Sequence, residues 1–118
     1  MEKAHGTTRF VILTKNYAIK LPTVVEWRLF LHGLLANMYE RMNYQAFKDT
    51  ASISYRLCPI CFSLPGGWLV VMKRAKPLVR DQFQLVDQID WTPIPVEEKL
   101  DSFGWYDGKI VAVDYGGR

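Results

Sequence analysis

Cysteine and histidine are scarce in this chain, with two of each among its 118 residues. Cys58 and Cys61 form a Cys-x-x-Cys pair, a spacing that suits half of a zinc site or a redox pair. A structural zinc ion needs two further ligands, and His5 and His32 are the only histidines that could supply them. Cys58 and Cys61 are therefore weak candidates as metal ligands, and we expect reduced thiols, which are typical of the cytoplasm.

Long hydrophobic runs and a strong net charge are also lacking. No apolar run approaches the ~18 residues that a membrane span needs, and the first five residues lack the apolar stretch of a signal peptide. We therefore expect a soluble, cytoplasmic protein without membrane contact. The formal net charge is only +3. One local basic cluster consists of Lys73, Arg74, Lys76 and Arg80, and we expect a solvated loop there rather than a nucleic-acid-binding face.

What the chain does contain is enough apolar material for one modest core. Hydrophobic residues make up 49% of the chain and aromatic residues 14%. We therefore expect a single domain over residues 1–118, in which residues 1–8 are flexible. Residues 9–14 and 17–21 are rich in β-branched and aromatic side chains, and they predict a hairpin that turns at residues 15–16.

One long helix is predicted after this hairpin. Thr23 and Glu26 have the spacing of a capping box, which predicts a helix over residues 23–47 that begins at Thr23. Apolar residues recur along it at helical spacing, so we expect this apolar face to pack on the sheet. The residues of that face are Trp27, Phe30, Leu31, Leu34, Leu35, Met38 and Met42.

Two more hairpins and a short helix follow. Residues 55–64 and 68–72 flank Pro65-Gly66-Gly67 and predict the second hairpin. Asp107-Gly108 predicts the third, because this dipeptide favours the tight turns that join two strands. A short helix is expected over residues 79–89. The expected fold class is therefore α+β, an antiparallel sheet with one long helix packed on it.

Several short motifs occur in the order in which protein kinases have them. Ala18-Ile19-Lys20 ends a strand, as does the kinase lysine that grips the nucleotide phosphates and pairs with a helix glutamate. "GWLVVMKRAKPL", residues 67–78, is similar to the fifth strand and hinge, and "EEKLDSFGWYDGKIVAVDYGG", residues 97–117, resembles the catalytic loop, the hairpin behind it and the D-F-G turn. The chain thus resembles a kinase small lobe plus the catalytic-loop and D-F-G hairpin, and most resembles the truncated kinase-like proteins of bacteriophages.

The resemblance implies a role for each matching residue. Lys20 would be the phosphate-binding lysine and Glu26, early in the helix, its partner. Glu40, farther along the same helix, is a second possible partner. Asp114, followed by Tyr115 and a glycine, matches the aspartate that holds magnesium in kinases. The residues alone also allow simpler roles, namely a solvated lysine, a helix-capping glutamate and a turn aspartate.

Departures from the kinase pattern argue against catalysis. The catalytic aspartate position falls on Glu97 and the magnesium-binding asparagine position on Ser102, while Lys99 matches a lysine often found two places after that aspartate. Glutamate is one methylene longer, and ~1 Å of misplacement can cost about a hundredfold in rate. We also expect no Gly-rich loop, activation loop or large lobe. The prediction is a degenerate pseudokinase without catalytic residues or a cofactor, and with at most weak binding of ATP and magnesium.

The surface that a kinase hides under its large lobe is the predicted interaction site, because aromatic anchors with a basic border supply a hot spot and electrostatic steering together. The resemblance thus implies a non-catalytic interaction protein, a phage-type inhibitor or regulator of a host protein or complex in the bacterial cytoplasm. A homodimer would also bury this surface. The alternatives are a residual ATP- and magnesium-dependent phosphotransferase and a small nucleic-acid-binding protein. The predicted partner-binding residues are Trp91, Phe103, Trp105, Tyr106, Arg74 and Lys76.

Overall fold

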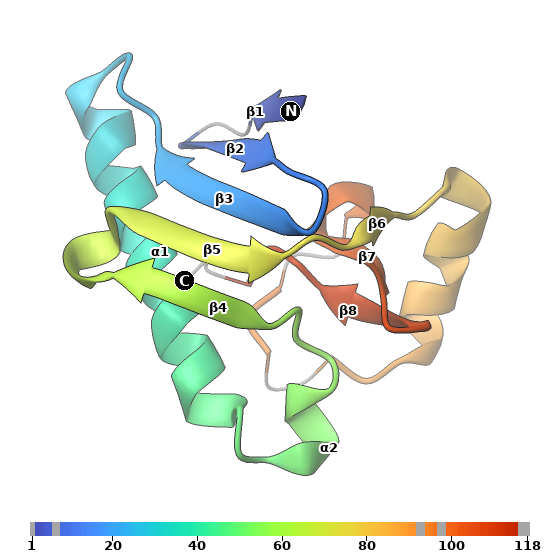
Figure 1. Cartoon of the computed structure of the whole chain (residues 1–118). Coiled ribbons are helices and arrows are strands. Elements are labelled where there is room, and N and C mark those ends of the chain that lie inside the picture. The colour runs from blue at the N-terminus through green and yellow to red at the C-terminus, as the bar shows by residue number, and fades with distance from the viewer. Residues whose placement is uncertain (1, 6–7, 92–93, 97–98, 116–118) are drawn as a thin grey trace.

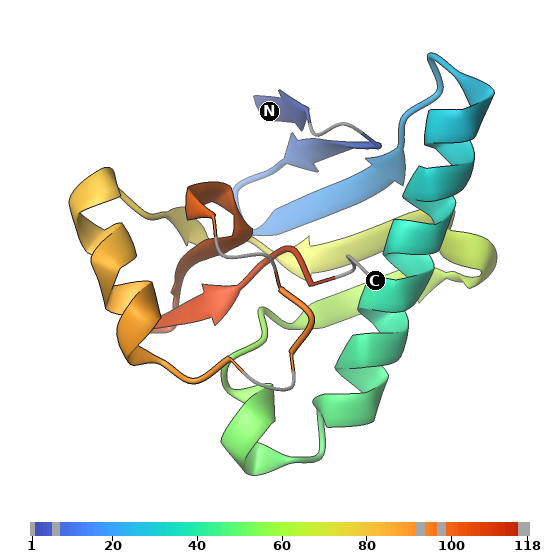
Figure 2. The ribbon, with the colours of Figure 1, turned by 180° about the vertical axis from the view of Figure 1, so that it is seen from behind.

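The structure, a computed structural model, describes residues 2–5, 8–91, 94–96 and 99–115. It has an α+β architecture with two antiparallel sheets and one long helix, α1 (Trp27–Phe47). Helix α1 crosses one face of the larger sheet, and the smaller sheet lies beside one end of the larger one (Figures 1 and 2). Among the described residues, none of the helices has both the length and the apolar character needed to cross a membrane.

The larger sheet has the strand order β1-β2-β3-β5-β4. The predicted hairpin at residues 15–16 is confirmed as β2–β3, and the second hairpin is confirmed as β4–β5, joined by the short helix η1 (Pro65–Gly67). Residues 2–5, which lie in the segment expected to be flexible, instead pair with β2 as an edge strand. The strands are β1 (Glu2–His5), β2 (Arg9–Leu13), β3 (Tyr17–Pro22), β4 (Ile60–Leu64) and β5 (Leu69–Lys73).

The smaller sheet has the order β6-β7-β8 and contains the third predicted hairpin. Its turn is formed by Asp107 and Gly108, both with positive φ, at 54° and 78°, as a tight hairpin turn requires. The short helix expected over residues 79–89 is the 3₁₀ helix η2 (Arg80–Gln88). The remaining elements are β6 (Lys76–Pro77), β7 (Phe103–Tyr106), β8 (Lys109–Ala112), α2 (Ala51–Ser54) and η3 (Leu100–Ser102).

Helix α1 begins four residues later than the capping box predicted. Thr23 is still held by the sheet region, because its backbone N–H donates to the Thr8 carbonyl at 2.9 Å. Glu26 is the N-cap residue, with extended backbone and no side-chain capping hydrogen bond. The predicted start at Thr23 was wrong because a backbone N–H that is already paired with a neighbouring segment does not need a helix cap.

The face that α1 turns toward the sheet is also different from the predicted one. Its buried residues are Gly33, Asn37 and Glu40, whereas most of the predicted apolar face is exposed. A Cβ at position 33 would lie 2.4 Å from the Thr8 carbonyl oxygen and 2.7 Å from Pro22 Cβ. The helix therefore approaches the sheet closely through a small residue, and the polar residues that follow meet charged partners there.

The buried apolar cluster joins β5, the β7–β8 hairpin and the segment that connects β6 to η3. It does not lie under the centre of α1, where the buried helix residues are polar or small. The apolar core thus holds the smaller sheet against the end of the larger one. Its buried members are Leu57, Cys58, Met72, Leu78, Val86, Trp91, Ile94, Phe103, Ile110, Val111, Ala112 and Tyr115.

Candidate functional site

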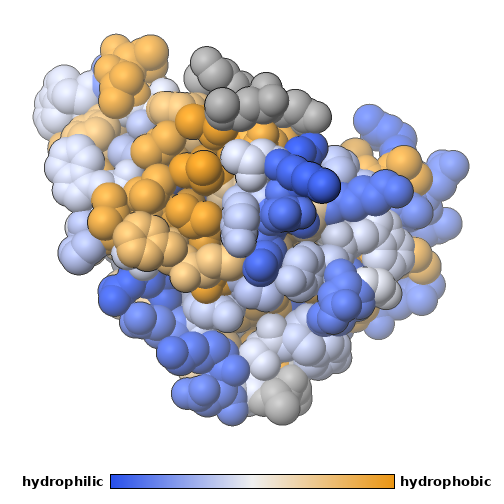
Figure 3. All heavy atoms as spheres, viewed as in Figure 1, coloured by the Kyte–Doolittle hydropathy of each residue, from blue (hydrophilic) through white to orange (hydrophobic). Residues whose placement is uncertain are grey.

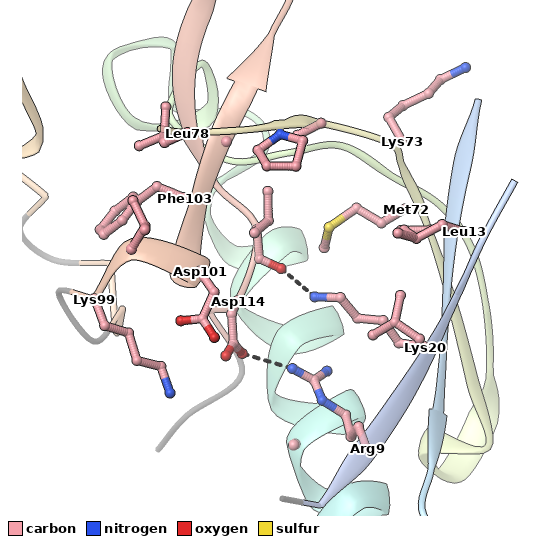
Figure 4. Close-up of a pocket in the computed structure, with 18 of the residues that line it drawn as sticks. Arg9, Leu13, Lys20, Met72, Lys73, Leu78, Lys99, Asp101, Phe103 and Asp114 are labelled. Carbon is pink, nitrogen blue, oxygen red and sulfur yellow. Dashed lines mark hydrogen bonds and ion pairs between the residues drawn. The ribbon is translucent and has the colours of Figure 1, made fainter. Parts of the chain in front are cut away.

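Four charged side chains meet between the larger sheet and α1. Arg9 and Val11 share one face of β2, and Lys20 of β3 lies directly opposite Val11. Because alternate residues of a strand share a face and opposite residues of a pair do too, both cations project to the same side of the sheet. Helix α1 contributes Glu40 from that side, and Asp114 follows β8 (Figure 4).

Glu40 is the centre of this charged cluster. Lys20 Nζ donates to Glu40 Oε1 at 2.8 Å, and Arg9 Nη1 donates to the same oxygen at 3.0 Å. The backbone N–H of Tyr115 donates to Glu40 Oε2 at 3.0 Å. Arg9 Nη2 donates to Asp114 Oδ1 at 2.7 Å. One buried carboxylate therefore links β2, β3 and the segment that follows β8.

Burial disfavours the charged form of the three central groups. For Glu40, the charges of Lys20 and Arg9 outweigh burial and hold the pKa of the carboxyl below its ordinary value. For Arg9, Glu40 and Asp114 outweigh burial and raise the pKa. For Lys20, burial dominates and lowers the pKa of the ammonium, although Glu40 favours the charged form. Lys20 also donates to the carbonyl of Val113.

Asn37, one turn before Glu40, completes the polar face of α1. Its Oδ1 accepts a hydrogen bond from Arg9 Nη1 at 2.9 Å. Its Nδ2 donates to the carbonyl of Lys20 at 3.2 Å and to that of Gly67 at 2.9 Å. This side chain is fully buried and uses both ends of its amide, so it fixes β3, the β4–β5 turn and Arg9 relative to the helix.

The segment after β8 is anchored by Tyr115. The hydroxyl of this buried side chain donates to the carbonyl of Cys58 at 2.8 Å, and its own carbonyl accepts from Asn43 Nδ2 at 2.8 Å. Burial, together with the nearby charge of Glu40, raises the pKa of the phenol. The anchor holds Asp114 at the edge of the cluster, where its side chain stays 41% exposed.

A cavity of about 570 Å³ opens beside the cluster, between the larger sheet and the segment around β7 (Figure 4). This volume lies within the range of sites that hold small molecules. One wall comes from strands β2, β3 and β5, and the facing wall from β6, η3 and β7. The apolar lining includes Val11, Leu13, Ala18, Met72, Leu78 and Phe103, and the polar lining includes Arg9, Lys20, Lys99, Asp101 and Asp114.

The predicted pairing of Lys20 with Glu26 is not found. Glu26 is exposed at the N-terminal end of α1, while Lys20 is buried against Glu40, the second possible partner considered from the sequence. The glutamate that holds the lysine is therefore farther along the helix than the first candidate. The reason is the late start of α1, which leaves Glu26 outside the helix.

Three further positions were singled out from the kinase pattern. Glu97 lies outside the described residues. Lys99 is exposed and lines the cavity. Ser102 is fully buried, is absent from the cavity lining, and its Oγ has no hydrogen-bond partner among the described residues. The structure therefore places Ser102 outside the cavity lining, although its carbonyl accepts from the backbone N–H of Val113, next to Asp114.

The aromatic surface predicted for partner binding is largely a core feature. Trp91 and Phe103 are buried, with ring centroids 4.7 Å apart. Trp105 and Tyr106 are half-buried, and Trp105 Nε1 donates to Gln82 Oε1 at 2.9 Å. Trp91 and Phe103 are therefore core residues rather than exposed anchors, because the segment that contains η2 and Trp91 covers the β7–β8 hairpin. Partner binding through Trp105 and Tyr106 stays a prediction.

The basic residues expected at the rim of that surface, Arg74 and Lys76, lie on the segment that leads from β5 of the larger sheet into β6 of the smaller one. Arg74 Nη1 donates to the carbonyl of Thr14 at 2.9 Å. Lys76, on β6, is exposed. Neighbouring Lys73 places its ammonium 4.9 Å from the ring centroid of Tyr17. Arg74 and Lys73 thus contact different parts of the chain, the Thr14 carbonyl and the Tyr17 ring.

The two cysteines differ in environment. Cys58 is buried, Cys61 is exposed, and both are free thiols. Burial raises the pKa of Cys58 to about 12, and its Sγ contacts the carbonyl of Lys73 at 3.0 Å. Among the described residues, no group of three or more His, Cys, Asp or Glu side chains is placed to hold a metal ion.

The sequence interpretation missed Arg9 and Asn37. A signal for Arg9 was present, because it shares its strand face with Val11 and Leu13 in a run that is otherwise apolar, "RFVIL". In the hairpin register that same face includes Lys20. Two inward-facing cations on adjacent strands require a buried anion opposite them.

Comparison of the chain with family models, curated proteins and solved structures finds no match.

Proposed function

We propose that this chain is a non-catalytic, kinase-like domain that acts by binding another macromolecule. The observation that supports the proposal is the ion pair between Arg9 Nη2 and Asp114 Oδ1 at 2.7 Å. In the kinase resemblance Asp114 is the residue that holds magnesium. Here the guanidinium of Arg9 supplies the positive charge beside that carboxylate.

The contacts of Asp114 and Glu40 leave few protein oxygens for a magnesium ion beside Asp114. Magnesium needs a near-octahedral shell of oxygen ligands. Asp114 Oδ1 already accepts from Arg9, and both oxygens of Glu40 accept from protein donors. The hydroxyl of Ser102 is buried away from the cavity. The charges of Arg9 and Lys20 balance those of Glu40 and Asp114 without a metal ion, and Lys99 and Asp101 add one further charge of each sign to the cavity lining.

The kinase-like part of the proposal rests on the order of the motifs and on one contact. Lys20 of β3 binds a glutamate of the following helix, Glu40, at 2.8 Å. A pairing of this strand lysine with a helix glutamate is typical of kinases, although the first candidate from the resemblance was Glu26. By that resemblance, the proposed partner is a host protein or complex of a bacteriophage-infected cell, and the proposed role is inhibition or regulation.

The cavity favours a second candidate function, the binding of a nucleotide. About 570 Å³ with apolar walls and cations at one end is suitable for a base with an attached phosphate group. On this alternative Lys20 and Lys99 would meet the phosphates, and Arg9 would have to leave Asp114 to admit a metal ion. The Arg9 contacts therefore decide between the two candidates.

Thermal melting with nucleotides distinguishes them. We expect ATP with magnesium to bind with a dissociation constant of about 1 mM or weaker, so that ATP at about 1 mM raises the melting temperature by no more than about 2 °C. ATP without magnesium is the control for metal-independent occupation of the cavity. A shift of several degrees that needs magnesium and disappears in Asp114→Asn would contradict the proposal and establish the second candidate. Incubation with γ-labelled ATP should transfer no phosphate.

A further inference from the structure

The outer face of α1 is an apolar surface that no described part of the chain covers. Trp27, Leu31, Leu35, Met38 and Met42 are 67%, 46%, 43%, 38% and 55% exposed. They follow one another at intervals of three or four residues, so they form one stripe, named here the outer stripe. At 1.5 Å per residue the outer stripe is ~22 Å long, or about four turns.

The border of the outer stripe is basic. Arg28 and Arg41 are both exposed, and the Arg28 guanidinium lies 5.8 Å from the ring centroid of Trp27. The only carboxylate within α1 is Glu40, which is buried on the opposite face. The neighbouring β4–β5 hairpin adds no acidic residue. Exposed carboxylates near the helix lie at its two ends, Glu26 before the first turn and Asp49 two residues after Phe47, and not along the outer stripe.

A small cavity adjoins the outer stripe. Its volume is about 120 Å³, and its lining includes Met38, Arg41, Met42, Leu64 and Gly67. It lies between α1 and the turn of the β4–β5 hairpin. A cavity of this order accepts a group the size of benzene, so it offers room for one apolar side chain of a partner beside an arginine.

A second apolar area competes for the same role. Figure 3 shows apolar side chains on the face of the larger sheet that is turned away from α1. Phe62 of β4, 53% exposed, belongs to the β4–β5 hairpin. The outer stripe differs from this area in its regular helical spacing, its two bordering arginines and the adjoining cavity.

We propose that the outer stripe binds an acidic, amphipathic α-helix of a partner protein. This inference rests on the proposed function and names the chemistry of the partner. An amphipathic helix places apolar side chains at the same three- and four-residue intervals, and acidic residues on its flanks complement Arg28 and Arg41. One of its apolar side chains would enter the cavity beside Met38 and Met42.

Charge also argues against two other occupants. In a dimer formed through two outer stripes, the arginines of both copies would border a single interface, and like charges there are unfavourable. Binding to an anionic membrane needs an array of cations on the polar face of a helix, whereas α1 has two arginines, both at the stripe. Two arginines are enough to pair with a partner helix that carries a few acidic residues.

The test uses the full chain and a designed probe. The probe is a fluorescein-labelled helical peptide of ~20 residues, with leucines at three- and four-residue intervals on one face and glutamates on both flanks. A matched peptide has lysine at every glutamate position. Fluorescence anisotropy should show the glutamate peptide binding at least about tenfold more tightly than the lysine peptide.

Variants of the chain locate the binding surface. Leu35→Glu should weaken binding of the glutamate peptide by about tenfold or more, because a carboxylate would enter the apolar contact. Phe62→Glu makes the same change on the larger sheet and should leave the affinity within about twofold. Exchange of both arginines, Arg28→Glu with Arg41→Glu, should reverse the preference, so that the lysine peptide binds more tightly. Melting temperatures confirm that each variant is folded.

Four results would overturn the inference. The first is that the glutamate peptide binds no more tightly than the lysine peptide. The second is that Phe62→Glu abolishes binding while Leu35→Glu leaves it intact. Sedimentation could show a dimer that Leu35→Glu dissociates, or vesicles containing phosphatidylglycerol could bind the chain through the outer stripe. Failure of the proposed function has a different signature, magnesium-dependent ATP binding, and leaves the peptide result unaffected.

Discussion

The two faces of α1 have the opposite character from those of an ordinary amphipathic helix on a sheet. The face toward the sheet buries Gly33, Asn37 and Glu40, while the outer face exposes a stripe of leucines, methionines and a tryptophan. An amphipathic helix usually buries its apolar stripe and exposes its charges. Here close approach through a glycine and a network of ion pairs replaces apolar packing at the contact with the sheet.

This comparison shows where the specific contacts of the fold lie. Each polar residue of the inner face meets a partner that is distant in sequence, such as Arg9 or Lys20. Loss of one member leaves another buried charge or amide without its partner, which is costly. The side chains of the outer stripe are exposed and leave no buried charge behind when they are replaced, so we expect substitutions there to preserve the fold. The predictions below test that difference.

The largest effect is expected at Glu40. Glu40→Ala leaves the buried cations Arg9 and Lys20 without their central carboxylate, and removal of one partner of a buried ion pair costs about 3–5 kcal/mol. Urea denaturation should show this loss of unfolding free energy. Glu26→Ala, the same change at an exposed position, is the matched control and should alter it by less than about 0.5 kcal/mol. Equal effects of the two changes would refute the buried network.

A smaller loss is expected when Gly33 is enlarged. A Cβ there would lie 2.4 Å from the Thr8 carbonyl oxygen, so Gly33→Ala should force α1 away from the sheet at a cost of about 1–3 kcal/mol. In an exposed helix the same substitution would stabilise by about 1 kcal/mol. The sign of the change in urea midpoint therefore decides whether α1 approaches the sheet closely at this position.

Acid should lower the unfolding free energy, because it protonates Glu40 on the inner face of α1. The pKa of Glu40 is lowered from 4.5 in the folded protein, so the unfolded chain binds its proton first as the pH falls. The stabilisation is then complete above about pH 4.5 and is lost as the pH drops through the lower folded pKa, with a slope of at most about 1.4 kcal/mol per pH unit. The carboxyl ¹³C shift of Glu40 should titrate below pH 4.5. A midpoint above that value would mean that burial outweighs the two cations.

The smallest effect is expected on the outer face. Leu35→Glu replaces a side chain that is 43% exposed, so we expect the unfolding free energy to stay within about 0.5 kcal/mol of the parent. Thermal melting measures this directly. A loss comparable with that of Gly33→Ala would show that the outer stripe is needed for folding, and the contrast between the two faces would no longer hold.

The three hairpins were predictable from the sequence because their signals are local. Asp107-Gly108 and Pro65-Gly66-Gly67 lie between runs of strand-forming residues, and the chain has few other ways to turn at these points. The existence of a long helix was predictable for the same reason. Its start was not, because the backbone N–H of Thr23 pairs with Thr8, a contact that no local pattern encodes.

The orientation of the helix and half of the charged cluster could not be read from periodicity. Hydrophobic spacing predicted an apolar inner face, but Arg9 and Lys20 project from the sheet and need anions opposite them, and only the face with Glu40 supplies one. Burial of Trp91 and Phe103 likewise depends on the path of the segment around η2. Asp114 was singled out from the sequence, but its partner Arg9 lies 105 residues away.

The central claim is that Arg9 takes the place of a metal ion beside Asp114. The most direct test is a titration with magnesium and ATP followed through the carboxyl ¹³C resonance of Asp114. The Arg9–Asp114 ion pair predicts that any change in this resonance has its midpoint at about 1 mM or above, in keeping with a dissociation constant of about 1 mM or weaker. It also predicts a larger response in Arg9→Met, where the carboxylate is released. A saturable shift in the parent chain with a midpoint below about 0.1 mM would contradict the claim.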